Sequence, residues 1–279
     1  MAIKFKDVKI KGSKNKLNFN IEISKTYGLI GNSGSNKTKI LELICGLEII
    51  ESGQVEILGD TLSGGSNEKD FFKVRKNIGY LFENPSEQFF QETVYDEISF
   101  ALKNFNYKKD DIDNHVKKAI KLVGLDEKYL DRNPFTLSCG EAKKVALASI
   151  LVYNPKIILL DDPTIGLDFK AKADLLKLLR VLKKRYNKTI IIASKDIDFI
   201  HKIVDHVLVI DQDKVVLSGT KYNVFSNQKI LKRIGINAPK LILFSDIVKK
   251  EKNINLGYRD DINDLMKDVY RYVKWYCVW

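Results

Sequence analysis

A short glycine-rich segment near the N-terminus has the residue types and spacing of a loop that binds phosphate. Residues 31–38 read GNSGSNKT and fit the pattern G-x-x-x-x-G-K-[ST], except that asparagine stands at position 36. In such a loop, backbone N–H groups and the N-terminus of the following helix point at the phosphates. We expect Lys37 to reach the β- and γ-phosphates and the Thr38 hydroxyl to lie on Mg²⁺. The residues expected to touch the nucleotide are Gly31, Asn32, Ser33, Gly34, Ser35, Asn36, Lys37 and Thr38.

Asparagine at position 36 is the one departure from this pattern. A Cβ at this point crowds a loop that passes close to the phosphates. Asparagine adopts unusual backbone angles more readily than most residues, so we expect the loop to tolerate it. The alternative is a chance glycine-rich turn, which is disfavoured because a strand pattern precedes the segment and a helix pattern follows it.

Two carboxylates follow a strongly apolar run later in the chain. Residues 157–160 read IILL, and Asp161 and Asp162 come directly after them. A buried strand would bring Asp161 to the phosphate site, where it can hold Mg²⁺ through water. Asp162 would then be placed to polarise the attacking water. An ordinary strand followed by a turn is the alternative, and the phosphate loop elsewhere in the chain argues against it.

The elements that must position these residues alternate between strand and helix. Apolar runs of strand length are separated by helical patterns at residues 37–45 and 140–153, which indicates an α/β domain with a largely parallel sheet. Residues 93–125 look helical throughout, and after about residue 220 the strand patterns stop and helical spacing takes over. The expected strands are residues 3–10, 17–23, 27–30, 54–58, 78–82, 157–160, 189–193 and 207–210.

Bulk composition is that of a globular protein. The 279 residues are 44% hydrophobic and 30% charged, and no run reaches the roughly 18 apolar residues of a membrane span. The N-terminus lacks the apolar core of a signal peptide, and Cys45, Cys139 and Cys277 have no metal or disulfide spacing, which favours a reduced, cytosolic protein. The net charge of +11 fits a mixed, Lys-rich surface better than a basic block for nucleic acid or membrane.

Taken together, these motifs resemble the ATP-binding subunits of ABC transporters. The phosphate loop resembles their Walker A motif, and Asp161 resembles their Walker B aspartate. Residues 166–168, GLD, are similar to the D-loop, and residues 194–196, SKD, stand where the family has Ser-His-Asp. The signature motif LSGGE is matched by Leu137, Ser138, Cys139, Gly140 and Glu141.

A narrower resemblance points to the energy-coupling factor group of these transporters, which imports vitamins and transition-metal ions. Residues 82–90, FENPSEQFF, followed by Thr93, Val94 and Glu97, are similar to that group's pattern FQNPxxQxFxxTVxxE. The resemblance implies an α/β P-loop NTPase (ABC ATPase) fold with a mixed sheet. The expected parts are an ATP-binding domain at residues 1–222, a helical insert at about 93–153, and a small C-terminal helical extension at 223–279 that serves as a subunit interface.

The resemblance also implies partners and a mechanism. ATP and Mg²⁺ would bind between two ATP-binding subunits, with the signature residues 137–141 and Asp168 of one facing the phosphate loop of the other. Integral membrane subunits would dock near residues 83–91 and feel the dimer close and open. The chain would then be a peripheral protein on the cytoplasmic face of the cell membrane, with no nucleic acid as partner.

Five positions depart from the family pattern, and three of them are expected to be catalytic. Asp162 replaces a longer Glu, and Lys195 replaces His. Glu83 replaces a Gln and keeps an oxygen ligand for Mg²⁺ beside Thr38 and Asp161, but it adds a negative charge. Cys139 replaces a signature glycine, and residues 11–16 lack the aromatic that usually stacks on adenine. We hypothesise that the chain binds ATP but hydrolyses it slowly at its own site, while a partner carries the competent chemistry.

Two other functions remain open from the sequence. A non-catalytic nucleotide-binding subunit would fit the altered residues at positions 83, 162 and 195. A DNA-associated ABC-type ATPase would fit the net charge, but such proteins usually carry a long coiled coil or zinc inserts, which this chain lacks. The scattered residues His115, His201 and His206 are expected to be structural, and the aromatic tail is expected to form an interface: Tyr270, Tyr272, Trp275, Tyr276 and Trp279.

Overall fold

The computed structural model describes residues 1–276, and the side chains of all of these except Asp110 and residues 273–276. The side chains of Trp275 and Tyr276 therefore lie outside the described residues, as do Cys277 and Trp279. In the part of the chain that the structure describes, no helix has both the length and the apolar composition needed to cross a bilayer.

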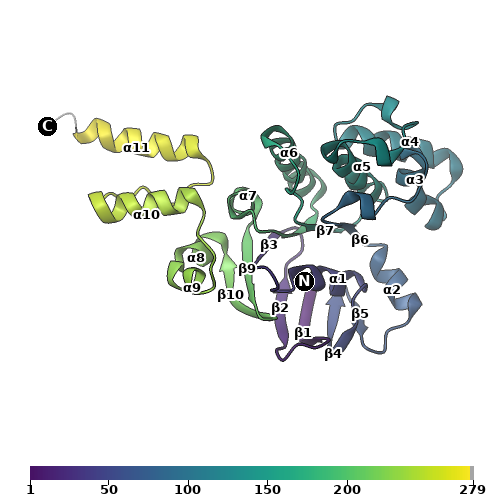
Figure 1. The fold of residues 1–279 in the computed structure, drawn as a ribbon, viewed down its shortest axis with the longest axis horizontal. Coiled ribbons are helices and arrows are strands. Elements are labelled where there is room, and N and C mark those ends of the chain that lie inside the picture. The colour runs from purple at the N-terminus through teal and green to yellow at the C-terminus, as the bar shows by residue number, and fades with distance from the viewer. Residues whose placement is uncertain (277–279) are drawn as a thin grey trace.

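A six-stranded sheet forms the centre of the molecule (Figure 1). Five of its strands are parallel, and the edge strand β10 pairs antiparallel with β9. The mixed sheet of the expected fold is therefore confirmed. The strand order is β10 (Lys214–Thr220), β9 (His206–Asp211), β3 (Thr26–Ile30), β8 (Thr189–Ala193), β7 (Ile157–Asp161) and β6 (Ile78–Leu81).

A second sheet of four antiparallel strands lies against one face of the central sheet. Its strands contribute buried residues to the same core as α1 (Lys37–Cys45) and one face of β7 and β8. The strand order is β2 (Leu17–Ile21), β1 (Ile3–Ile10), β4 (Ile50–Ile57) and β5 (Asp60–Ser63).

Most of the remaining helices form a lobe at one end of the molecule, a layer over the central sheet, and an extension at the other end, while α2 (Glu68–Arg75) lies beside β5 of the antiparallel sheet (Figure 1). The helical lobe contains α3 (Val94–Asn104), α4 (Lys109–Leu122) and α5 (Cys139–Leu151), with 3₁₀ turns at Pro85–Glu87, Glu127–Tyr129 and Pro134–Thr136. The others are α6 (Phe169–Tyr186), α7 (Ile197–Ile203), α8 (Lys221–Ser226), α9 (Gln228–Arg233), α10 (Lys240–Lys252) and α11 (Ile262–Tyr276).

Strand β7 shows how the central sheet separates two cores. Ile158 and Leu160 belong to the core shared with α3–α7, whereas Ile157 and Leu159 face the core shared with the antiparallel sheet. Because successive side chains of a strand point to opposite faces, a run of four apolar residues is buried on both sides. This burial places the strand end, Asp161, in the interior.

The structure corrects several expected boundaries. The stretch 93–125 is not one helix, because Asn106 takes the left-handed backbone conformation at φ 59° between α3 and α4. Strand β2 ends at Ile21, before Ser24 at φ 59°, and β4 begins at Ile50 rather than at residue 54. The domain boundary at residue 222 stays a prediction, at a position that α8 spans.

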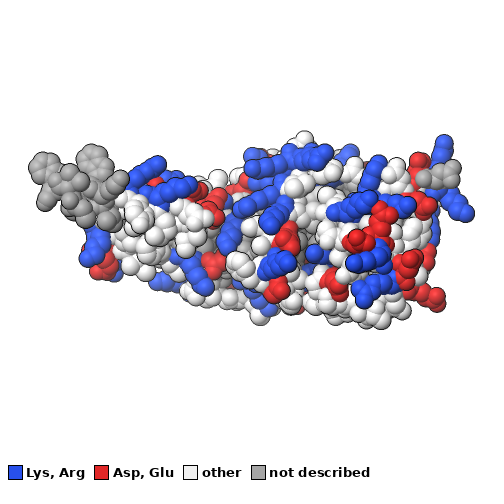
Figure 2. Space-filling view, turned by 90° about the horizontal axis from the view of Figure 1, so that it is seen from above, with Lys and Arg blue, Asp and Glu red and all other residues white. Residues whose placement is uncertain are grey.

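Charged side chains are mixed over the surface. On the face drawn in Figure 2, basic side chains are spread along the whole length of the molecule and acidic side chains lie among them. Such interleaving is the pattern expected of a solvated surface with a net positive charge.

Candidate nucleotide site

The phosphate loop connects β3 to α1 and passes close to the end of β9. All five residues of β3 are buried, so the strand brings Gly31 to a crowded edge of the sheet. A Cβ at Gly31 would lie 2.3 Å from the Ile210 carbonyl oxygen and 2.5 Å from the Ser35 Oγ. Glycine is therefore required here by the close approach of backbone and side chain.

Asn36 occupies the position where the loop pattern has its last glycine. Its backbone lies in the left-handed region, at φ 59° and ψ 31°, and it is the N-cap of α1. Asparagine enters this region more readily than most non-glycine residues, which explains why the loop can keep its course here. The Asn36 side-chain amide donates a hydrogen bond of 2.5 Å to Asp213 Oδ1.

Lys37 is held in place within the loop. Its ammonium donates to the Gly31 carbonyl oxygen at 2.8 Å, to the Asn32 carbonyl oxygen at 3.1 Å and to the Ser35 Oγ at 3.1 Å. Burial lowers the pKa of Lys37 and the nearby Lys195 lowers it further, while Asp162 and Asp161 act in the opposite direction. The ammonium therefore feels the charge of both carboxylates at the end of β7 while its hydrogen bonds go to the loop.

Asp161 lies at the buried end of β7 beside the first turn of α1. Burial raises the pKa of this carboxyl, and so do the charges of Asp162 and Glu83, while the nearby Thr38 hydroxyl and a hydrogen bond of 3.4 Å from the Tyr80 hydroxyl oppose the rise. The fold thus joins the last residue of the phosphate loop to the acidic strand end.

The oxygen donors at this point fit Mg²⁺. The hydroxyl of Thr38 and the carboxylates of Asp161 and Glu83 are hard ligands of the kind that this ion prefers. Among the described residues, no three His, Cys, Asp or Glu side chains converge on one metal position. An ion here would therefore take its remaining ligands from phosphates and water.

Asp162 is turned toward the end of β8. Its backbone has φ 37°, and its N–H donates to the Ala193 carbonyl oxygen at 2.8 Å. Its Oδ1 accepts a hydrogen bond of 2.9 Å from the Ser194 hydroxyl and one of 3.0 Å from the Lys195 backbone N–H. The carboxylate is thereby tied to the strand end, which limits how far it can reach toward a water molecule.

Lys195 and Glu83, the other two expected catalytic residues, are both exposed. Glu83 follows β6, in the loop that the buried carboxylate of Glu97 supports by accepting from the N–H groups of Phe90 at 3.0 Å and Gln91 at 3.1 Å. The Glu97 side chain thus explains the spacing between the loop motif and α3.

The expected signature residues begin α5 in the helical lobe. Ser138 caps the helix, and its backbone N–H donates to Glu141 Oε2 at 3.0 Å. The Tyr129 hydroxyl donates to Glu141 Oε1 at 2.6 Å, and with the Ser138 hydroxyl it lowers the pKa of Glu141 to about 2. Leu137 is half-buried, and Cys139 is exposed at the start of the helix beside the half-buried Gly140.

Lys143 was missed by sequence reasoning. It is 1% exposed, and its ammonium donates to the Ile165 carbonyl oxygen at 2.8 Å, which ties α5 to the loop after β7. In that loop, Asp168 caps α6 by accepting from the Ala171 N–H at 2.7 Å, and a Cβ at Gly166 would lie 2.6 Å from Cys139 Sγ. No local pattern marks a lysine in an apolar helix as buried; only the packing shows it.

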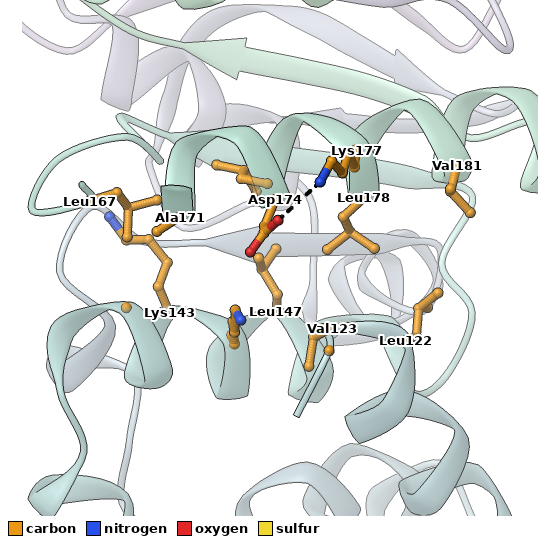
Figure 3. Close-up of a pocket in the computed structure, with 14 residues that line it drawn as sticks. Leu122, Val123, Lys143, Leu147, Leu167, Ala171, Asp174, Lys177, Leu178 and Val181 are labelled. Carbon is orange, nitrogen blue, oxygen red and sulfur yellow. Dashed lines mark hydrogen bonds and ion pairs between the residues drawn. The ribbon is translucent and has the colours of Figure 1, made fainter. Parts of the chain in front are cut away.

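Two cavities border these elements. One of about 360 Å³ lies between α5 and α6, where Lys143 and Leu147 face Asp174 and Leu178 (Figure 3). It contains no phosphate-loop residue. The other, of about 560 Å³, is lined by Asn32, Ser33, Lys195 and the C-terminal residues 235–238. The Asn32 amide also donates to the Ile234 carbonyl oxygen, so the C-terminal segment lies against the phosphate loop.

The structure therefore divides the expected site residues into two groups. At the carboxyl edge of the parallel strands, the charges of Asp161, Asp162 and Lys195 act on Lys37 of the phosphate loop, and the charge of Glu83 acts on Asp161. The signature residues lie apart from it, on α5 in the helical lobe (Figure 1).

Comparison with known proteins identifies the family of this chain. The family model described as ABC transporter matches residues 14–165. The energy-coupling factor transporter ATP-binding protein EcfA2 of Acetivibrio thermocellus is 37% identical over 88% of this chain and 85% of its own length. The protein of the same name from Clostridium tetani is 35% identical over 86% of this chain and 83% of its own length.

Solved structures agree. The structure of cbiO1 from Clostridium perfringens, part of the ABC transporter complex cbiONQ, has a TM-score of 0.74 at 28% identity and covers 91% of this chain and 99% of its own. A dimeric ATP-binding cassette bound to ADP and phosphate has a TM-score of 0.71 at 25% identity, covering 78% of this chain and 98% of its own. The chain belongs to the ABC transporter family, within its group of energy-coupling factor transporter ATP-binding proteins.

Proposed function

We propose that this chain is the ATP-binding subunit that energises an energy-coupling factor importer of vitamins or metal ions, and that its own ATP site hydrolyses slowly. The observation that carries the proposal is the contrast at the end of β7. Asp161 meets Thr38 of the phosphate loop, whereas the next carboxylate, Asp162, is tied to the end of β8.

Binding of ATP rests on the phosphate loop. The Lys37 ammonium now donates to loop oxygens, and these contacts can be exchanged for the β- and γ-phosphates with little movement. Thr38 and Asp161, with Glu83 beside them, would hold Mg²⁺, which neutralises the phosphate charge when it is bound. The loop N–H groups at the start of α1 complete the cradle.

A second ATP-binding subunit would complete the site. Signature residues 137–141 lie on a different lobe from the phosphate loop. In a pair of subunits, the signature residues of one would face the phosphate loop of the other. Beside the Gly166–Asp168 turn, Ile165 is 46% exposed and Phe169 is 87% exposed. Exposure of large apolar side chains at this loop indicates that another protein surface covers them in the assembly.

The C-terminal extension, residues 223–279, would form a further interface between subunits. Large apolar side chains are exposed on α10 and α11, which extend away from the sheet (Figure 1). Uncovered aliphatic and aromatic groups on two adjacent helices favour pairing with another protein surface. These side chains are Phe244, Ile247, Ile262, Met266, Tyr270 and Tyr272.

Integral membrane subunits would dock on the helical lobe beside Glu83. Phe90 and Phe135 are 56% and 58% exposed, and the Phe90 ring packs edge-on against Phe100 at 4.6 Å between centroids. An aromatic surface next to the loop that ends at Gln91 can accept an apolar helix and feel movement of that loop. This docking would hold the chain at the cytoplasmic face of the membrane as a peripheral protein.

Slow hydrolysis follows from the residues around the γ-phosphate. Asp162 is one methylene shorter than the Glu usual in the family, and misplacement of about 1 Å can cost on the order of 100-fold in rate. Lys195 supplies a cation but no acceptor nitrogen, and Glu83 adds a negative charge next to Asp161. A partner subunit would then carry the faster chemistry.

A non-catalytic, purely regulatory subunit is the second candidate. The hydrogen bonds that hold Asp162 to Ser194 and Lys195 favour it, because a carboxylate used in this way has a structural role without any water to activate. The two candidates differ in whether a small remodelling of the site restores turnover.

The test is co-purification of the full chain with its ATPase partner and membrane subunits, followed by steady-state ATPase assays at saturating Mg-ATP. The variant D162E/K195H/E83Q should raise turnover at this site at least about tenfold, measured with the partner's own site inactivated. The control K184A changes an exposed residue of α6 outside the site. No gain in the triple variant would favour the non-catalytic subunit, and brisk turnover by the unmodified chain alone would contradict the proposal.

A further inference from the structure

We infer that Asp213, in the turn between β9 and β10, is a positioning residue for the phosphate loop, which it holds open for phosphate through the side chain of Asn36. The inference rests on the proposed binding of ATP at residues 31–38. It assigns a role to a residue that lies 177 positions from Asn36 in the chain and that no phosphate-loop pattern includes.

Sheet topology brings this turn to the loop. Strand β9 is the parallel neighbour of β3, with Leu29 opposite Leu208 and Ile30 opposite Val209. Parallel neighbours end at the same edge of a sheet, so the chain leaving β9 emerges beside the chain leaving β3. The β9–β10 connection then turns back at Gln212 and Asp213, which have φ of 47° and 59°. Two consecutive left-handed residues make a tight turn, and this turn lies against the loop.

Asn36 needs this support because of its own backbone. A side chain with a Cβ pays a cost in the left-handed region that glycine avoids. The hydrogen bond from Asn36 Nδ2 to the carboxylate of Asp213, 2.5 Å long and partly buried, is made in that conformation and offsets the cost. A glycine at position 36 would need no such bond and could make none.

The conformation of Asn36 decides where the phosphate-binding groups point. Helix α1 begins at the next residue, Lys37, and its first turn is closed by the Ile40 N–H donating to the Asn36 carbonyl oxygen at 3.1 Å. If Asn36 left the left-handed region, the N–H groups of Lys37 and Thr38 would rotate away from the phosphates. Asp213 thus acts on the nucleotide without touching it.

The turn that carries Asp213 is itself braced. The Asn15 side-chain amide donates to the Gln212 carbonyl oxygen at 2.7 Å, which joins the turn to the β1–β2 loop. The Gly31 position packs against the Ile210 carbonyl oxygen just before the turn. The acceptor for Asn36 is therefore fixed from two sides, as a positioning group must be.

A double-mutant cycle between positions 36 and 213 tests the inference. Asp213→Gly removes the acceptor and introduces no Cβ strain at φ 59°, and Asn36→Gly removes the need for the acceptor. We would measure the Kd for Mg-ATP by calorimetry on the full chain with its ATPase partner, and the thermal unfolding of the ligand-free chain. D213G should weaken Mg-ATP binding about fivefold and lower the melting temperature by about 3 °C.

The other variants distinguish a positioning role of Asp213 from a general structural role. D213N keeps an acceptor oxygen and should stay within about twofold of the unmodified chain. In the N36G background, D213G should change the Kd by less than about 1.5-fold, because no left-handed asparagine remains to be held. The matched control is K214A, in the same hairpin. Lys214 is exposed and forms no hydrogen bond or ion pair with residues 31–38, all of which the structure describes.

Two results would overturn the inference. One is that D213G weakens Mg-ATP binding equally in the chain with Asn36 and in the N36G variant. The effect of Asp213 would then not depend on the Asn36 side-chain amide. The other is no loss at all. Failure of the unmodified chain to bind Mg-ATP would instead overturn the proposed function, and the stability cycle on the ligand-free chain would still decide whether residues 36 and 213 are coupled.

Discussion

The residues that would hold the nucleotide and the residues that would act on its γ-phosphate lie at the same edge of the sheet, but the fold supports them differently. Lys37 and Asp161 are 7% and 3% exposed, and each has neighbours that orient it toward the phosphate position. On the acting side, Lys195 and Glu83 are exposed, and the Asp162 carboxylate accepts hydrogen bonds from Ser194 and Lys195, directly after β8.

This difference teaches that binding and turnover have separate structural requirements. A phosphate is gripped largely by backbone N–H groups and one ammonium, so substitutions such as Asn36 are tolerated when the backbone path is kept. Activation of water depends on the position of a single carboxylate to within about 1 Å. An altered site can therefore lose speed long before it loses its ligand.

The largest expected effect is on the holding side. Lys37→Met keeps the aliphatic stem and removes the ammonium, so Mg-ATP binding measured by calorimetry should weaken at least about 100-fold. Lys39→Ala, two residues along α1, is the control and should change the Kd less than about twofold. Near-normal affinity in K37M would mean that the loop does not hold the phosphates.

The next effect is on the acting side. Asp162→Glu adds the methylene that the site lacks, and we expect the single-site ATPase rate to rise on the order of 10-fold with an unchanged Kd for Mg-ATP. Asp162→Gln introduces a side chain as long as Glu but without its charge. It is the matched control and should show no gain in ATPase rate. If D162E and D162Q behaved alike, the reach of this carboxylate would not limit hydrolysis.

A smaller effect concerns stability and pH. Burial raises the pKa of Asp161, so the folded state binds its proton more tightly than the unfolded state does. The stability from this group is present at low pH and is lost as pH rises through the raised pKa. Asp161→Asn removes the buried charge and should therefore stabilise the ligand-free chain at pH 7. The expected gain in the free energy of unfolding is roughly 1 kcal/mol, which is typical of a stabilising substitution.

The same variant should separate stability from function. The gain of D161N in thermal unfolding should disappear as pH falls below about 4, where the Asp161 carboxyl of the parent chain becomes protonated in the unfolded state as well as in the folded state. Mg²⁺ should also no longer strengthen the binding of ATP to D161N, which is checked by measuring the Kd for ATP with and without the ion. A D161N chain that is less stable than the parent at neutral pH would contradict the assigned environment of Asp161.

The smallest expected effect is at Lys195, which is exposed and therefore screened by water. Lys195→Gln removes the cation, and we expect Mg-ATP to bind about threefold more weakly without a change in melting temperature. Lys195→Arg should keep the affinity. A loss larger than about 20-fold in K195Q would place Lys195 with the holding residues instead of the acting ones.

Much of the molecule could be predicted from the sequence because the deciding signals are local. The glycine-rich loop between strand and helix, the run IILL before Asp161, and the motif at residues 137–141 are short patterns whose chemistry follows from their own residues. They were sufficient for the fold class and for the family, both of which the comparisons confirm.

Elements with weak local patterns were harder. Strand β10 is partly exposed along its length and lies at an edge of the sheet, so it lacks the apolar run that marks β7. The break between α3 and α4 depends on one residue, Asn106, in the left-handed conformation. Neither feature produces the sustained periodicity from which strands and helices are predicted.

The sequence by itself determined which residues can grip a phosphate and that the residues at positions 83, 162 and 195 are altered. Only the tertiary structure decided what those residues touch. The bonds from Asp162 to Ser194 and from Asn36 to Asp213, and the burial of Lys143, join segments 22 to 177 positions apart. Such contacts are set by which strands are neighbours in the sheet and which helices pack on it, and no local pattern carries that information.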